Sequence, residues 1–282
     1  MKTIKLTKMQ GCGNDFVIID FQEYEKTGME MSELAKKVCD RNFGVGADGM
    51  IIPKLNPENK EADISWYFYN SDGSTAQMCG NGMRCFTKYC IDNKLVDKKA
   101  FSVETLAGII KPELLENGLI KVNMGKPVLE DKKIPFWNEN GEHKLIAMDK
   151  EFDITPVSMG NPHCVIISND DPLELAKTYG PVIEKHEFFP EKTNTEFVKV
   201  KSRMEIDMRV FERGCGITLA CGTGACASVV ACVLNNLTEN KVKVNLLGGP
   251  VFVEWQGSAD DTEKDIFLIG SANYSFFADY IL

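Results

Sequence analysis

The chain has 282 residues, of which 44% are hydrophobic, 26% charged and 9% aromatic, a composition that excludes a disordered, collagen-like or coiled-coil protein. Its 41 acidic and 32 basic side chains give a formal charge of −9, so we expect no cationic surface that could bind a nucleic-acid backbone or an anionic bilayer. The opening residues MKTIKLTKMQ lack the apolar core of a secretory signal, and the longest nearly apolar run, 225–234, is half a membrane span. We therefore expect a cytoplasmic protein with no nucleic-acid or membrane partner.

Strands are predicted where apolar and polar residues alternate, and turns where Gly, Asn and Asp cluster. The segment 44–49 has the letters of a dinucleotide-binding motif, but no strand precedes it and the strand-like Met50-Ile-Ile follows it, so we do not expect a nucleotide there. The charged segment 132–151 reads as a solvated linker or hairpin, and 260–265 as a turn. Four predicted strands lie at 64–69, 118–122, 206–211 and 251–255.

Two helices are predicted, each directly after a cysteine. The helix after Cys79 reads as amphipathic, with Arg84, Thr87 and Lys88 on its polar side. The helix after Cys221 is apolar all round, so it must be buried on every side. A sheet wrapped around this helix would bury it in that way.

An internal repeat relates the two predicted helices. Shifted by 142 positions, Cys79-Gly-x-Gly falls on Cys221-Gly-x-Gly, and Asn70 falls on Glu212. A second match, shifted by 147 positions, places the segment 13–16 over 160–163. A twofold repeat of this length predicts two similar domains, with the active site between them.

The ten cysteines include no Cys-x-x-Cys pair, and the three histidines are isolated in the sequence. We therefore expect reduced thiols and neither a metal site nor a disulfide-exchange site. A cysteine at a helix N-terminus lies among unpaired N–H groups and the positive end of the dipole. These groups should lower its pKa from about 8.5 towards neutrality, and they can also hold a carboxylate near the sulfur.

Two such sites indicate a reaction that inverts a carbon centre. One cysteine would remove a proton as the base and the other would deliver one as the acid, and the roles exchange with direction. The substrate carboxylate would lie between two helix N-termini, where charge developing on its oxygens is stabilised. Cys79 and Cys221 are therefore the candidate catalytic residues.

The motifs of the chain resemble those of the diaminopimelate epimerase family, which are pyridoxal-independent two-cysteine epimerases. This family interconverts LL- and meso-2,6-diaminopimelate in lysine and peptidoglycan biosynthesis. The resemblance spans nearly the whole chain and is carried by five motifs, which are Gly13-Asn-Asp-Phe, Asn70-Ser-Asp-Gly-Ser, Cys79-Gly-Asn-Gly with Arg84-Cys, Gly160-Asn-Pro-His-Cys, and Glu212-Arg-Gly followed by Ala220-Cys-Gly-Thr-Gly-Ala.

The resemblance implies an α/β (α+β) fold of two pseudo-symmetric domains, each a mostly antiparallel sheet rolled around a central helix. The domains would comprise residues 1–123 plus 271–282, with Cys79, and residues 124–270, with Cys221. The active site would lie in the cleft between them. The resemblance also implies a small-molecule substrate, no cofactor, no metal and a possible homodimer.

The resemblance further implies roles for individual residues. Cys79 and Cys221 match the catalytic cysteines, and His163 and Glu212 match polar groups that tune or relay their protons. The remaining matched residues bind substrate: Gly80, Asn81, Gly222 and Thr223 at the carboxylate, Asn70 and Glu212 at the α-amino group, and Asn14, Asn161, Asn194 and Arg213 at the distal end.

Two positions depart from the family pattern. Gly49 stands where some members have Gln after Asp, and Ile217 stands where many have Glu. Both lie near loops that would face the substrate, so they bear on specificity for its side chain.

Three alternatives remain. A cofactor-free proline racemase or hydroxyproline epimerase also has paired cysteines, but its substrate lacks a second amino-acid end. An isomerase of the phenazine-biosynthesis type has a similar fold without the cysteine pair. A thiol-based redox sensor or a metal-binding module is motivated only by the number of cysteines.

Overall fold

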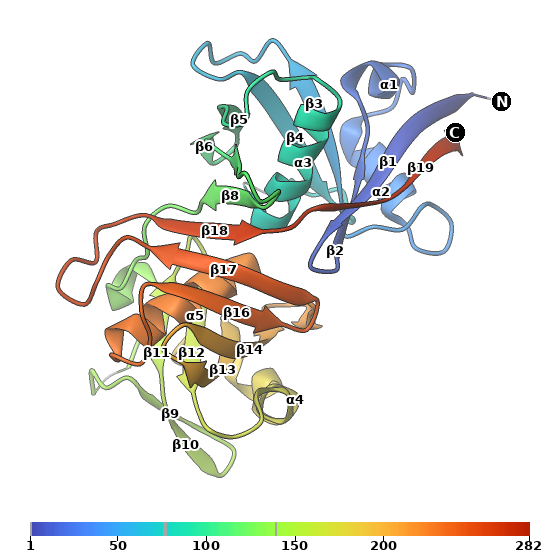
Figure 1. The fold of residues 1–282 in the computed structure, drawn as a ribbon. Helices are drawn as coiled ribbons and strands as arrows, with labels where there is room; N and C mark the ends of the chain where they lie inside the picture. Colours follow the sequence, from blue (N-terminus) through green and yellow to red (C-terminus); the bar gives the residue numbers. More distant parts are fainter. Residues whose placement is uncertain (1, 76–77, 139) are drawn as a thin grey trace. The chain divides into compact units, whose positions relative to one another are not determined.

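The computed structural model describes residues 2–75, 78–138 and 140–282 (Figure 1). The chain divides into two compact units: unit 1 comprises Met1–Val122 and Gly270–Leu282, and unit 2 comprises Asn123–Ile269. Each unit contains a large sheet and a buried helix, which confirms the predicted fold class.

The sheet of unit 1 has the strand order β19-β1-β2-β3-β4-β5-β6. Its first pairing, β19 with β1, is antiparallel, and the pairings from β1 to β6 are antiparallel, parallel, antiparallel, parallel and antiparallel. The short strands β7 and β8 form a further antiparallel pair. The strands are β1 (Thr3–Gly11), β2 (Asn14–Ile18), β3 (Gly49–Leu55), β4 (Ile64–Asn70), β5 (Val103–Thr105), β6 (Gly108–Ile110), β7 (Glu113–Leu114), β8 (Ile120–Asn123) and β19 (Asn273–Ile281).

Three helices belong to unit 1, namely α1 (Phe21–Glu25), α2 (Met31–Cys39) and α3 (Gly80–Asp92). Helix α2 packs Leu34, Ala35 and Val38 against one face of β1, β2 and β3, while α3 contacts β1, β2, β3 and β7. The runs 16–19 and 50–52 are apolar at every position because their strands are covered on both faces.

Unit 2 repeats this pattern of pairings. From β11 through β12, β13, β14 and β16 to β17 they are again antiparallel, parallel, antiparallel, parallel and antiparallel, and β18 then pairs antiparallel with β17. A hairpin of β9 and β10 and a short strand β15 beside β14 add to it. The strands are β9 (Lys144–Ala147), β10 (Lys150–Asp153), β11 (Thr155–Ser158), β12 (Pro162–Ile167), β13 (Asn194–Ser202), β14 (Glu205–Glu212), β15 (Gly216–Ile217), β16 (Lys241–Leu246), β17 (Gly249–Trp255) and β18 (Ile266–Gly270).

Helix α5 (Gly222–Leu234) is the central helix of unit 2, and it contacts β11, β12, β13, β14 and β17. These strands come from both ends of the sheet order, so the sheet wraps around the helix. All residues of α5 from Gly224 to Val233 are buried, as its apolar sequence predicted. Helix α4 (Pro172–Ile183) covers the other face of the sheet, and a 3₁₀ turn, η1, lies at Asp131–Lys133.

The sequence prediction for α3 was wrong in one respect. Arg84 and Thr87, which we expected on a polar face, are fully buried. Arg84 donates from Nε to the carbonyl of Ser271 at 3.1 Å, and Thr87 donates from Oγ1 to the carbonyl of Met83 at 2.7 Å. Because backbone carbonyls accept these bonds, the polar side chains can be buried, and α3 is enclosed almost as completely as α5.

Candidate active site

The two candidate catalytic cysteines occupy the same structural position in their units. Cys79 is the N-cap of α3 and Cys221 is the N-cap of α5, and both have extended backbone angles. The Sγ of Cys79 accepts from the Gly82 N–H at 3.4 Å, and the Sγ of Cys221 accepts from the Gly224 N–H at 3.3 Å. Sulfur thus takes the place that a Ser, Thr or Asp oxygen usually has at an N-cap.

N–H groups of a helix first turn follow each cysteine. Gly80 and Asn81 form the first turn of α3, and Gly222 and Thr223 form that of α5. N–H groups in a first turn have no carbonyl partner within the helix, and together with the dipole they suit a carboxylate. Each unit therefore has a thiol directly beside N–H groups that could hold an anion.

We use the name first half-site for the predicted residues of unit 1, which are Asn14, Asn70, Cys79, Gly80 and Asn81. Within it, the Oδ1 of Asn14 accepts from the Cys79 thiol at 3.7 Å and from the Asn81 side-chain amide at 3.2 Å. Asn70 donates from its side chain to Ser74 Oγ at 3.0 Å. Asn14 is therefore one of the predicted residues that the structure brings into contact with Cys79.

An ionic network holds Asn14 from the other side. Asp48 Oδ2 accepts from the Asn14 side-chain amide at 2.6 Å. Arg41 contacts both Asp48 and Asp15 at 2.8 Å, and Lys8 contacts Asp15 at 2.5 Å. Burial alone would raise the pKa of Asp15, but hydrogen bonds from Arg41 and Lys8 lower it to about 2.

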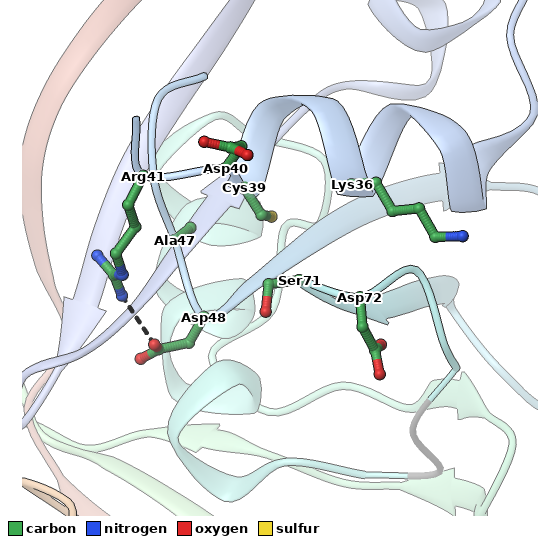
Figure 2. A pocket seen from close by; sticks show the side chains of 8 residues that line it. All are labelled: Lys36, Cys39, Asp40, Arg41, Ala47, Asp48, Ser71 and Asp72. Carbon is green, nitrogen blue, oxygen red and sulfur yellow. Dashed lines mark hydrogen bonds and ion pairs between the residues drawn. The ribbon is translucent and has the colours of Figure 1, made fainter. Parts of the chain in front are cut away.

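A pocket of about 410 Å³ opens beside this network (Figure 2). None of the predicted site residues lines it, although Asp48 does. Burial raises the pKa of its Cys39 thiol to about 12, so this thiol is protonated at neutral pH. The lining residues are Lys36, Cys39, Asp40, Arg41, Ala47, Asp48, Ser71 and Asp72.

The second half-site comprises the predicted residues of unit 2, which are Asn161, His163, Asn194, Glu212, Arg213, Cys221, Gly222 and Thr223. Cys221 is only 6% exposed, and its Sγ lies 3.4 Å from Thr223 Oγ1. Burial raises the pKa of Glu212, although hydrogen bonds from Thr218 and Cys221 oppose this effect.

The expected low pKa of Cys221 was wrong. Burial raises the pKa of this thiol well above its usual range, and the negative charges of Glu212 and Glu196 raise it further. Hydrogen bonds from Thr223 and the Gly224 N–H act in the opposite direction but are weaker. Desolvation and nearby carboxylates therefore outweigh the helix N-terminus at this cysteine.

His163 and Glu196 form a fully buried pair in the second half-site. His163 Nδ1 lies 2.7 Å from Glu196 Oε1, and its Nε2 lies 3.0 Å from Asn161 Oδ1. Glu196 was not among the residues predicted from the sequence. A sequence signal for it existed, because it is the one charged residue in the otherwise uncharged run 193–198 of a buried strand.

Two predicted distal residues bind backbone atoms. Asn194 donates to the carbonyl of Pro162 at 2.8 Å and accepts from the Arg213 N–H at 3.0 Å. The side chain of Arg213 is exposed and donates to the carbonyl of Glu191 at 3.1 Å. Asn194 thus ties β12 to the turn that carries Arg213.

The comparisons with known proteins identify the family. The model for "Diaminopimelate epimerase" matches residues 6–130 and 155–275. A diaminopimelate epimerase of Halothermothrix orenii is 45% identical over 278 residues, which cover 95% of each chain. A chloroplastic diaminopimelate epimerase of Oryza sativa is 42% identical, over 99% of this chain and 81% of that one.

This chain belongs to the diaminopimelate epimerase family. The resemblance seen in the sequence motifs is thereby confirmed, and the chain is an isomerase by family.

Solved structures similar to this epimerase family member extend the fold to other enzymes. A phenazine biosynthesis protein of Bacillus anthracis matches with a TM-score of 0.72 and 18% identity over 100% of both chains. A hydroxyproline epimerase of Agrobacterium vitis matches with a TM-score of 0.70 and 11% identity over 99% of this chain and 93% of that one. At these identities the likeness concerns the fold alone.

No helix in residues 2–75, 78–138 or 140–282 is long and apolar enough to cross a membrane. In the same part of the chain, no three His, Cys, Asp or Glu side chains are grouped so that they could hold a metal ion.

Proposed function

We propose that the protein epimerises LL-2,6-diaminopimelate to meso-diaminopimelate, without a cofactor, by transferring protons between two cysteines and Cα. The observation that carries this proposal is the duplicated N-cap: Cys79 and Cys221 each accept from the third N–H of a buried helix. The family and its relatives of the same name support the choice of substrate. The reaction serves lysine and peptidoglycan biosynthesis in the cytoplasm.

In this proposal the two half-sites act on opposite faces of one stereocentre. The domains comprise residues 1–123 plus 271–282 and residues 124–270, and the substrate binds in the cleft between them. The amides of Gly80, Asn81, Gly222 and Thr223 hold the substrate carboxylate. As Cα loses its proton, negative charge moves onto that carboxylate, and the two helix N-termini stabilise it.

One cysteine starts the reaction as the thiolate and the other as the thiol. The thiolate takes the Cα proton, the thiol delivers its own proton to the opposite face, and the charges of the two sulfurs are exchanged. The reverse reaction uses the same groups in opposite roles. His163 and Glu212 tune these protons, while Asn70 and Glu212 bind the α-amino group.

The distal end of the substrate carries a second ammonium and a second carboxylate. Arg213 suits that carboxylate because a guanidinium can bind it with two parallel hydrogen bonds. Asn14, Asn161 and Asn194 complete the distal site. The exposure of Arg213 in this structure is compatible with a side chain that turns towards the substrate when it binds.

We also propose a homodimer through β19. This strand is at the end of the sheet order in unit 1 and carries Phe276, Phe277 and Ile281, which are 45%, 70% and 57% exposed. An exposed apolar edge strand is a ready pairing surface. Sedimentation should give a dimer for the wild type and a monomer for Phe277→Lys; a monomeric wild type would contradict the dimer.

The decisive experiment follows isotope exchange by NMR. Purified protein is mixed with LL-diaminopimelate in deuterated water without pyridoxal phosphate, with L-proline as the control substrate. Deuterium should enter one Cα as the meso form appears, and proline should not exchange. Exchange of proline but not of diaminopimelate would contradict the proposed substrate.

A further inference from the structure

The His163–Glu196 pair is an unusual feature for the interior of a sheet. Both side chains are 0% exposed, and the second carboxylate oxygen of Glu196, Oε2, has no hydrogen-bond partner within the described part of the chain. Burying charged groups costs free energy even when they are paired, and an unsatisfied buried oxygen adds to that cost. A pair with a purely structural role would therefore lower the stability of the folded protein.

The other unit demonstrates that the fold does not need this pair. In unit 1 the strand register places Ile18 opposite Ile51 and Ile51 opposite Phe68; in unit 2 it places Val165 opposite Glu196 and Glu196 opposite Val210. Glu196 therefore occupies the position that Ile51 has in unit 1. By the same register His163 corresponds to Phe16.

The apolar pair of unit 1 and the His163–Glu196 pair lie next to equivalent glycines. A Cβ on Gly82 would meet Phe16 at 3.4 Å and Ile51 at 3.5 Å. A Cβ on Gly224 would lie 2.6 Å from Glu196 Oε1 and 3.2 Å from Cys221 Sγ. The carboxylate and the catalytic sulfur thus lie on either side of one small space, and glycine is required there.

We propose that Glu196 is a positioning residue for the second half-site, whose buried carboxylate fixes His163 as a donor at Nδ1 and keeps Cys221 as the protonated thiol in the free enzyme. This inference rests on the proposed two-cysteine function. Before substrate binds, Cys221 therefore carries the proton that will be delivered to Cα.

The electrostatics of the second half-site agree with this assignment. Glu212 on β14 and Glu196 on β13 act on Cys221, and Glu196 is paired with His163 on β12. The two carboxylates, Glu212 and Glu196, disfavour a further negative charge on the Cys221 sulfur. Burial and Glu196 also raise the pKa of the Cys164 thiol, so Cys164 cannot supply a competing thiolate.

The test compares Glu196→Gln with the wild type. The amide keeps the size of the side chain and removes its charge. Alkylation by iodoacetamide is followed as a function of pH by mass spectrometry of the peptides that carry Cys79 and Cys221. The midpoint for Cys221 should move to lower pH by about one unit, while that for Cys79 should stay unchanged.

Turnover gives a second readout of the same variant. Glu196→Gln should lower kcat for diaminopimelate about tenfold, which is less than the loss from removing an acid or base itself, and KM should change less than twofold. Glu205→Gln is the matched control, because Glu205 also lies on the sheet but binds Lys243 and Asn245 at the far end of β14. It should leave both alkylation midpoints and kcat unchanged.

If Glu196→Gln does not fold, the role of Glu196 can still be tested on the wild type by NMR of His163. In protein labelled with ¹⁵N-histidine, Nδ1 of His163 should carry a proton at neutral pH. A bare Nδ1, or an unchanged Cys221 midpoint in folded Glu196→Gln, would overturn the role of Glu196. Because neither readout requires diaminopimelate, failure of the proposed substrate would be recognised separately.

Discussion

The two half-sites have the same backbone and different side chains beneath it. Cys79 and Cys221 cap their helices with nearly the same distance from sulfur to the third N–H. Phe16 and Ile51 lie beside Gly82, three residues after Cys79, whereas Glu196, which pairs with His163, lies beside Gly224, three residues after Cys221. The sheet tolerates either pair at these positions.

The two half-sites therefore share the helix N-terminus and differ in the side chains packed near it. In the proposed mechanism the two helix N-termini, one in each unit, both hold the substrate carboxylate. The charges are placed differently: in unit 1 Asp48 holds Asn14, which accepts from Cys79, whereas in unit 2 Glu212 and Glu196 act directly on Cys221 and raise the pKa of its thiol.

The largest expected effect comes from removing either sulfur. Cys79→Ala and Cys221→Ala should each lower the rate of epimerisation by about 10²- to 10⁴-fold or more, because each removes an acid or base. Turnover of LL-diaminopimelate followed by deuterium incorporation measures this loss. Near wild-type rates in either variant would remove the two-base scheme.

Matched controls for the cysteine variants lie on the same helices. Cys90 and Cys232 are both fully buried and are equivalent in the repeat, but they lie near the other ends of α3 and α5. Cys90→Ala and Cys232→Ala should lower the melting temperature and leave kcat unchanged. An equal loss of activity in these variants would show that the effect of removing a sulfur does not depend on its position at the N-cap.

The glycines under the two cysteines should respond differently to alanine. In Gly224→Ala the new Cβ would stand 2.6 Å from Glu196 Oε1, so strain of about 1–3 kcal/mol and displacement of Cys221 are expected. In Gly82→Ala the nearest atom is Trp66 at 3.3 Å, and stability should stay within about 1 kcal/mol of the wild type. Urea unfolding and kcat of both variants test the contrast, and equal losses would contradict it.

Substitution of Asp48 tests whether its hydrogen bond to Asn14 supports the first half-site. Asp48→Asn weakens the charge-assisted bond that orients Asn14 towards Cys79. Such a bond contributes about 1.5 kcal/mol or more, so kcat/KM should fall roughly tenfold. Asp63→Asn, which removes another exposed aspartate paired with a lysine in unit 1, is the control. If both variants kept full activity, the orientation of Asn14 would not depend on Asp48.

The repeat in the sequence was sufficient to predict two similar domains and both N-cap cysteines, because glycines and cysteines recur at one fixed shift. The repeat did not predict a role for Glu196, because the equivalent position in unit 1 holds Ile51 and the two residue types differ. The buried Arg84 was missed for a different reason: its partner, the Ser271 carbonyl, lies 187 residues away. Residues whose role depends on distant partners are not visible as local patterns.

The pKa of Cys221 illustrates the same limit for electrostatics. The helix N-terminus was visible in the sequence, and it does favour a thiolate. The opposing effects, burial within unit 2 and the carboxylates of Glu196 and Glu212, come from other strands. The sign of the shift was therefore decided by contacts between segments that the sequence does not place together.

Acid should destabilise the ionic support of unit 1 through Asp15. Its folded pKa of about 2 is below its ordinary value of 3.8, so the ionised carboxylate stabilises the folded state above about pH 4. That contribution is lost as pH falls from about 4 towards 2, because the unfolded chain binds the proton first. After allowing for partial exposure, it amounts to about 1–2 kcal/mol. Asp15→Asn should remove it, so the free energy of unfolding of the variant should fall less than that of the wild type between pH 4 and pH 2. Urea titrations across this range measure the difference, and parallel curves would mean that Arg41 and Lys8 do not stabilise the charged form of Asp15.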